Sequence, residues 1–172
     1  MMQHLPAHFS GLEFTSGQVG SLFSLVMAGM IIANISVGAL NDKIDSTITL
    51  TVVVVCMVIA LFFLATTRSF LALSIVMFIL AFGLGGPAVL TPLVVSEVFG
   101  IGDYPRIWSI LGMAPSIGMS ISGPLWGAVY DVTGSYAIGM YAMMGLAIIY
   151  GICYLFALKN GPLKQPLNVT SI

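Results

Sequence analysis

The chain has 172 residues, of which 59% are hydrophobic and only 6% are charged, and its formal net charge is −1. Soluble domains contain about 25% charged residues, so this composition excludes an ordinary soluble globule. The balance of charge leaves no basic surface for phosphates, and we therefore expect no nucleic-acid partner.

Five long segments without a charged side chain dominate the sequence. They cover residues 14–41, 46–67, 69–96, 107–130 and 132–158, and each exceeds the roughly 20 residues that a helix needs to cross a bilayer. We predict an all-α, polytopic transmembrane helix bundle, with an exterior lead at residues 1–13, a five-helix transmembrane domain at 14–158 and a cytoplasmic tail at 159–172. The predicted spans are residues 16–40, 47–67, 70–95, 107–130 and 136–158.

The basic residues set the predicted orientation. Lys43, Arg106, Lys159 and Lys164 fall on one side of the five spans, and Arg68 falls on the other. Because cytoplasmic loops carry the excess of Lys and Arg, we expect the N-terminus outside and the C-terminus in the cytoplasm of a plasma or inner membrane. A start outside the cell without a basic signal region indicates that an upstream helix is missing.

The spans differ in their content of small and helix-breaking residues. The first, third and fourth are rich in Gly, Ser, Pro and Asn, whereas the second and fifth hold few. Helices pack closely in lipid at small residues, so we expect the three rich spans to be packed on several sides or to line a cavity, and the other two to be peripheral. Helix packing alone would produce the same pattern. Pro87, Pro115 and Pro124 are predicted to kink their helices.

Few polar side chains lie deep in the spans. We take Asn34 as the strongest candidate for a substrate path, because an amide in hydrocarbon requires a partner, and Ser24, Thr91, Ser116 and Ser120 as weaker candidates. An interhelical hydrogen bond would explain Asn34 equally well, and hydroxyls can bond to their own helices. No span holds an acidic, basic or histidine side chain. We therefore expect no enzyme, no cofactor and no metal site.

The segment between the first two spans carries a short signature. It reads Gly-Ala-Leu-Asn-Asp-Lys over residues 38–43, which resembles the G-x-L-x-D-R/K loop of the major facilitator superfamily. The resemblance implies a conformational switch built from Gly38, Asp42 and Lys43, together with Arg106 before the fourth span. In physical terms, the Asp42 carboxylate would cap the N-terminus of the fourth span, and the cations would join it in a charge cluster. The alternative is an ordinary charged turn.

Two later segments resemble the same superfamily. Glu-Val-Phe-Gly at 97–100 and the stretch 123–136, which ends in Tyr-Asp-Val-Thr-Gly-Ser-Tyr, are similar to elements near the tenth and eleventh helices of monocarboxylate and oxalate:formate-type carriers. We expect Gly134 to supply a positive φ in a tight exterior turn. The resemblance implies that the five spans correspond to helices eight to twelve of a twelve-helix carrier. Where animal monocarboxylate carriers place an aspartate and an arginine, this chain has Met30 and Asn34.

Together these features predict a partial, C-terminal carrier that moves a small organic solute, such as an organic anion, by alternating access. Its expected partners are membrane lipid, the solute, and the missing N-terminal half or an oligomeric copy. The alternative is a non-transporting membrane protein, either a truncated product or a scaffold or assembly subunit.

Overall fold

The structure is a computed structural model that describes residues 5–161, and every regular element in that range is a helix. The elements are α1 (Leu5–Ser10), α2 (Ser16–Lys43), α3 (Ser46–Thr66), α4 (Phe70–Leu111), α5 (Met113–Thr133) and α6 (Ala137–Asn160). The predicted all-α fold class is confirmed. Residues 1–4 of the predicted lead and residues 162–172 of the predicted tail lie outside the described residues, and these include Lys164.

Local sequence determines where α2 and α3 begin. The Thr15 side chain accepts a hydrogen bond from the Gln18 backbone (3.3 Å), and the Gln18 side chain accepts one from the Thr15 backbone (3.0 Å), which forms a capping box. Asp45 caps α3 by accepting a 2.7 Å bond from the Thr47 backbone N–H. The connection between α2 and α3 is therefore confined to residues 44 and 45.

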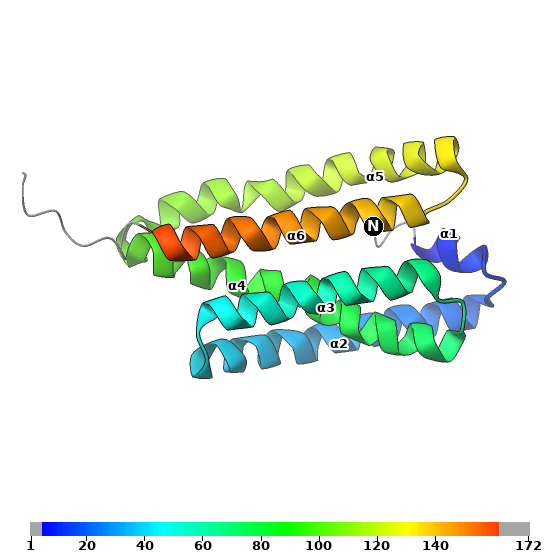
Figure 1. Cartoon of the computed structure of the whole chain (residues 1–172), viewed down its shortest axis with the longest axis horizontal. Helices are drawn as coiled ribbons and strands as arrows, with labels where there is room; N and C mark the ends of the chain where they lie inside the picture. The colour runs from blue at the N-terminus through cyan, green and yellow to red at the C-terminus, as the bar shows by residue number, and fades with distance from the viewer. Residues whose placement is uncertain (1–4, 162–172) are drawn as a thin grey trace, which may run out of the picture.

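Within residues 5–161, four helical runs are long and apolar enough to cross a membrane: α2, α3, the run Phe70–Thr133 and α6. The third run has 64 residues. A straight helix of that length would measure about 96 Å, roughly three times the thickness of the hydrocarbon core. It contains both the third and the fourth predicted spans, so the five predicted spans correspond to four runs. The run breaks at Gly100, whose φ of 81° favours glycine, and Figure 1 shows α5 returning beside α6.

The helix α4 is central to the packing. It packs against both α2 and α3, and α3 also packs against α6 (Figure 1). The helices approach most closely where a glycine lacks a side chain. A Cβ at Gly83 would lie 2.8 Å from the Met57 Cα, and a Cβ at Gly86 would lie 2.7 Å from a Val53 methyl group. The glycines of the third span therefore serve helix packing.

Buried apolar side chains form two clusters, one toward each end of the bundle. The cluster near α1 joins Phe9 to Leu64, Met77 and Trp126, and the other joins Leu50, Leu90 and Leu158 to their neighbours. Phe9 is fully buried. The short helix α1 is thereby anchored to the bundle, although it is far too short to span a membrane.

The packing of the second and fourth spans differs from the prediction. The second span, α3, lies against both α4 and α6 and is not peripheral within this chain. The fourth span is largely exposed: residues 109–121 are exposed throughout, and Trp126 is the buried residue of α5. The physical reason is that α5 has little contact with the other described helices. Its small residues would allow another helix to pack closely, but little of α4 or α6 lies against them.

Candidate functional site

The third, fourth and fifth predicted spans line an open cavity of about 640 Å³, which we call the central cavity. Its size falls within the range of small-molecule sites, about 300–1,000 Å³. It is built by the middle of α4, the junction of α4 and α5, and the second half of α6. Its lining residues are Leu84, Pro87, Ala88, Thr91, Trp108, Leu111, Gly112, Ala114, Pro115, Tyr150 and Tyr154.

The central cavity is mostly apolar and carries a few polar groups. The Tyr150 hydroxyl is buried and has no hydrogen-bond partner among the described residues. The hydroxyls of Thr91 and Tyr154 are its polar neighbours. Thr91 Oγ1 instead donates to the Pro87 carbonyl at 2.6 Å. A buried hydroxyl without a partner costs about 1–3 kcal/mol, so Tyr150 is a polar group that can still accept or donate a hydrogen bond within the cavity.

The Tyr150 and Tyr154 rings lie one helical turn apart, with their centroids separated by 4.5 Å. This pair supplies an aromatic wall to the central cavity, and Trp108 supplies another from the far side of the Gly100 break. We expected the fifth span, which carries Tyr150, to be peripheral, and neither Tyr150 nor Trp108 was among the predicted site residues. The signal that was available is the spacing of the two tyrosines, since residues four apart share one face of a helix.

The structure places the predicted substrate-path residues in different surroundings. Thr91 lines the central cavity. Asn34 is exposed on α2, with its side chain packed so closely against Gly85 of α4 that a Cβ there would lie 2.6 Å from Asn34 Oδ1. The remaining three, Ser24, Ser116 and Ser120, are exposed.

Two of these serines bond to their own helices. Ser24 Oγ donates to the Gly20 carbonyl at 3.0 Å, and Ser120 Oγ donates to the Ser116 carbonyl at 2.9 Å. A hydroxyl that bonds back to its helix tolerates lipid as well as water. The structure thus brings Thr91 to the cavity but leaves the other four candidates outside its lining.

The predicted switch residues lie at one end of the bundle, but the structure links that end through other groups. Asp42, Lys43 and Arg106 are exposed, and no ion pair or hydrogen bond joins them within residues 5–161. Gly38 packs lightly against Val89 of α4, where an added Cβ would make ordinary contact at 3.9 Å. The polar link at this end is a 2.7 Å hydrogen bond from Ser46 Oγ to Glu97 Oε2, which sequence reasoning missed.

The three predicted kink prolines occupy distinct helical positions. Pro87 and Pro124 lie inside α4 and α5. Pro115 lies in the first turn of α5, just after the interruption at Gly112 that separates the two helices. Because Pro115 has no N–H, it cannot donate to the Leu111 carbonyl, which accounts for a helix boundary there. The sharper break in α4, however, is at Gly100 and not at a proline.

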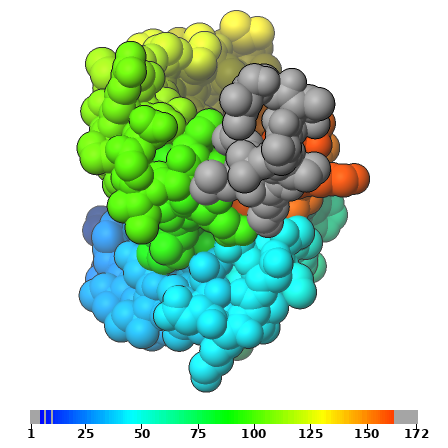
Figure 2. Space-filling view, turned by 90° about the vertical axis from the view of Figure 1, so that its left-hand side faces the viewer, coloured from blue at the N-terminus to red at the C-terminus, as the bar shows by residue number. Residues whose placement is uncertain are grey.

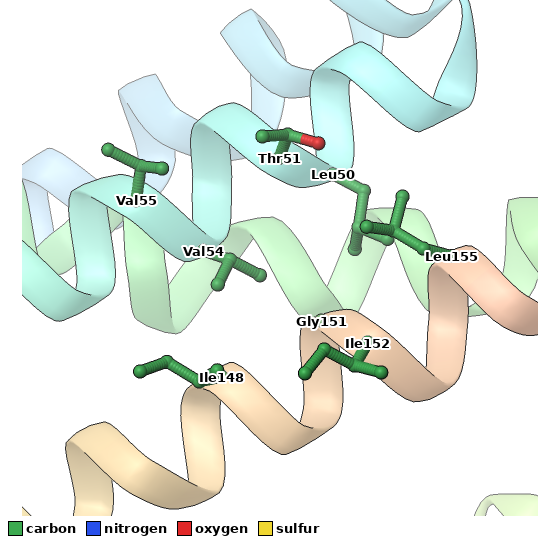
Figure 3. Close-up of a pocket in the computed structure, with 8 residues that line it drawn as sticks. All are labelled: Leu50, Thr51, Val54, Val55, Ile148, Gly151, Ile152 and Leu155. Carbon is green, nitrogen blue, oxygen red and sulfur yellow. The ribbon is translucent and has the colours of Figure 1, made fainter.

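A smaller gap of about 150 Å³ lies between α3 and α6 (Figure 3). The side chains around it are aliphatic apart from Thr51, whose hydroxyl donates to the Thr47 carbonyl at 2.8 Å. Figure 3 shows Val54 and Leu50 of α3 directed toward Gly151 and Leu155 of α6. This gap offers no free polar group and is a packing defect at a helix contact.

The fold and the central cavity define a class of protein: a multi-pass α-helical membrane protein with a cavity between its helices. A family model described as the Major Facilitator Superfamily matches residues 3–171. The chain therefore belongs to the major facilitator superfamily and is a membrane transporter of that kind. Members of this family are transporters and not enzymes. Searches of curated proteins and of solved structures returned no match.

Proposed function

We propose that the chain is the C-terminal part of a secondary carrier, equivalent to helices eight to twelve, and that it moves a small organic solute by alternating access. Membership of the superfamily supports a transport role. The resemblance of residues 97–100 and 123–136 to elements near the tenth and eleventh carrier helices supports the assignment to this half, in the branch of the monocarboxylate and oxalate:formate carriers. Carriers of this kind bind their solutes between two halves near the middle of the membrane.

The observation that carries this proposal is the central cavity, together with the buried Tyr150 hydroxyl that lines it. Its volume of about 640 Å³ suits a small organic molecule, and Tyr150 offers a buried hydrogen-bonding group. Aromatic rings from Trp108 and Tyr154 suit a flat or apolar part of the solute. No charged residue is among the described residues that line the cavity. If the solute is an organic anion, the cation that neutralises it belongs to the partner half.

The exposed segment 109–121 supports the need for a partner. Its large apolar side chains include Ile117 at 56% exposure and Met119 at 69%, and it also bears Ser116 and Ser120. A helix in lipid gains little from hiding such side chains, but its small residues permit close packing against another helix. We propose that the N-terminal half of the carrier covers this face, with a second copy of the chain as the alternative occupant and lipid around the rest.

We place the protein in the plasma or inner membrane with its N-terminus outside. On this orientation the Ser46–Glu97 hydrogen bond and the exposed charges Asp42, Lys43 and Arg106 lie on the cytoplasmic side. We propose that these exposed charges bind the partner half in one conformation and separate from it in the other. Their exposure within residues 5–161 leaves them accessible to such a partner.

Uptake of labelled organic solutes into proteoliposomes tests the proposal. The chain is reconstituted alone and together with a candidate N-terminal half encoded beside it. We expect saturable uptake when both parts are present, and we expect Tyr150→Phe to raise the KM more than Tyr141→Phe does, since Tyr141 is exposed on the same helix. Absence of uptake in both preparations contradicts the proposal and favours a non-transporting role as a scaffold or truncated product.

A further inference from the structure

A second cavity, of about 300 Å³, lies at the end of the bundle that carries α1, and we call it the α1 cavity. Three segments that are distant in sequence build it: α1 contributes His8, the α3–α4 connection contributes Arg68, and the end of α5 with the following turn contributes Tyr130, Ser135 and Tyr136. It is separate from the central cavity, with which it shares no lining residue.

Arg68 is the one charged side chain among the described residues that line the α1 cavity. Arg68 is exposed at its rim and His8 is half-buried within it. The neighbouring segments also carry the carboxylates Glu13 and Asp131, but neither of these is among the described residues that line the cavity. Burial lowers the pKa of His8, a hydrogen bond with the Leu64 backbone opposes this shift, and the nearby charge of Arg68 lowers the pKa further. Both residues line the cavity. Such a space favours an anion over a cation.

Aromatic side chains hold the wall of the α1 cavity in place. The rings of Tyr130 and Tyr136 are stacked with centroids 4.5 Å apart, and the His8 ring meets the Tyr136 ring edge-on at 6.2 Å. Gly134, with a φ of 66°, ends α5 in the left-handed conformation and makes this sharp turn possible, as predicted. A phenol, an imidazole and a guanidinium therefore lie around one opening.

We propose that the α1 cavity binds a small oxyanion, of the phosphate or carboxylate type. The Arg68 guanidinium presents paired N–H donors that match two oxygens of such a group, and the hydroxyl-bearing residues Tyr130 and Ser135 line the same opening. A free anion in solution and the phosphate of a lipid headgroup share this chemistry, and both reach the end of a membrane bundle. The bound anion would connect α1 to the two loops and fix the position of the lead. This inference does not depend on the transport proposal.

The test uses the purified full chain in nanodiscs of uncharged phosphatidylcholine, titrated with sulfate by calorimetry. We expect saturable binding, and we expect Arg68→Gln to weaken it by about tenfold or more, because a charge-assisted bidentate contact is lost. Lys159→Gln removes one positive charge at an exposed position in the last turn of α6 and is expected to leave the affinity unchanged. Circular dichroism checks that each variant retains its helices.

A second arm distinguishes the sources of the anion. The same proteins are placed in nanodiscs containing phosphatidylglycerol, and native mass spectrometry counts retained lipids. A lipid headgroup is the occupant if the wild-type chain retains phosphatidylglycerol, the Arg68→Gln variant loses it, and phosphatidylglycerol reduces sulfate binding to the wild-type chain. Sulfate binding that is unaffected by the lipid identifies a free anion. The proposal is overturned if neither sulfate binding nor lipid retention responds to Arg68→Gln.

Discussion

The Ser46 hydroxyl donates a 2.7 Å hydrogen bond to Glu97 Oε2 and so joins the first residue of α3 to α4 just before the Gly100 break. The two residues are 51 positions apart in the sequence. Figure 2 faces this end of the bundle, where the cyan start of α3 lies directly against the green part of α4. This hydrogen bond holds the start of α3 against α4, three residues after the end of the signature at residues 38–43.

Replacing Ser46 with alanine should lower the stability of the bundle. A hydrogen bond to a charged group contributes about 1.5–3 kcal/mol, and Ser46 is buried, so water does not readily take its place. Thr51→Ala is the matched control, because that hydroxyl is exposed and bonds only to its own helix. Thermal unfolding in detergent measures both variants. Equal shifts in Tm for the two would contradict the role assigned to the Ser46–Glu97 bond.

Adding a methyl group at Gly83 should destabilise the contact between α3 and α4. The new Cβ would lie 2.8 Å from the Met57 Cα, and a backbone atom cannot move aside as a flexible side chain does. We expect Gly83→Ala to cost about 1–3 kcal/mol, as overpacking usually does. Gly145→Ala on α6 has open space around it and should be neutral or stabilising. Urea or detergent unfolding titrations compare the two, and a harmless Gly83→Ala would refute the close helix contact.

Removing the Tyr150 hydroxyl should lower the affinity for the solute without lowering the stability of the bundle. Tyr150→Phe deletes a buried polar atom that has no partner in the described chain, so the bundle should be as stable as the wild type or more stable by about 1 kcal/mol. If the solute satisfies this hydroxyl, its affinity should fall by up to about tenfold in the same variant. Thermal unfolding and solute binding are measured side by side. Loss of stability without loss of affinity would show that Tyr150 only packs.

The docking of α1 should weaken in acid. Burial lowers the pKa of His8 below its ordinary value of 6.5, the charge of Arg68 lowers it further, and the Leu64 backbone opposes both. The folded state therefore binds a proton at His8 less readily than the unfolded state does. Stability from this group is complete above pH 6.5 and declines as the pH falls from there through the lowered pKa.

Hydrogen exchange of residues 5–14 between pH 7.5 and pH 5, corrected for the intrinsic dependence of exchange on pH, measures this effect. In His8→Gln, the corrected exchange rates of residues 5–14 should no longer change with pH, because glutamine does not titrate. Retention of the full dependence in His8→Gln would assign it to other groups.

Much of the fold followed from the distribution of charge. The uncharged segments predicted the helices because hydrocarbon excludes both charged side chains and unpaired backbone. The positive φ at Gly134 followed from local turn chemistry. The junction of the third and fourth spans did not follow, since the sequence between them continues as helix on both sides of Gly100 and the break depends on one glycine.

The candidate site was predicted less completely. Thr91 was predicted from polarity and depth, and it does line the central cavity. Tyr150 and Trp108 were not predicted as site residues. They line the cavity only because α4 and α6 pack together, and tertiary packing of this kind is not visible in the sequence. For the same reason Asp42 could be recognised by its motif, whereas the Ser46–Glu97 bond required knowledge of which helix ends lie together.

The most direct test of the central claim, that the central cavity lies on a solute path, is the reactivity of an engineered cysteine at Thr91. The native Cys56 and Cys153 are first replaced by serine, and membranes containing the reconstituted carrier are treated with a small, membrane-impermeant thiol reagent. The account predicts that Thr91→Cys is labelled, that excess solute slows the labelling, and that Val52→Cys on α3 stays unreactive. Equal protection of both positions, with or without solute, would contradict it.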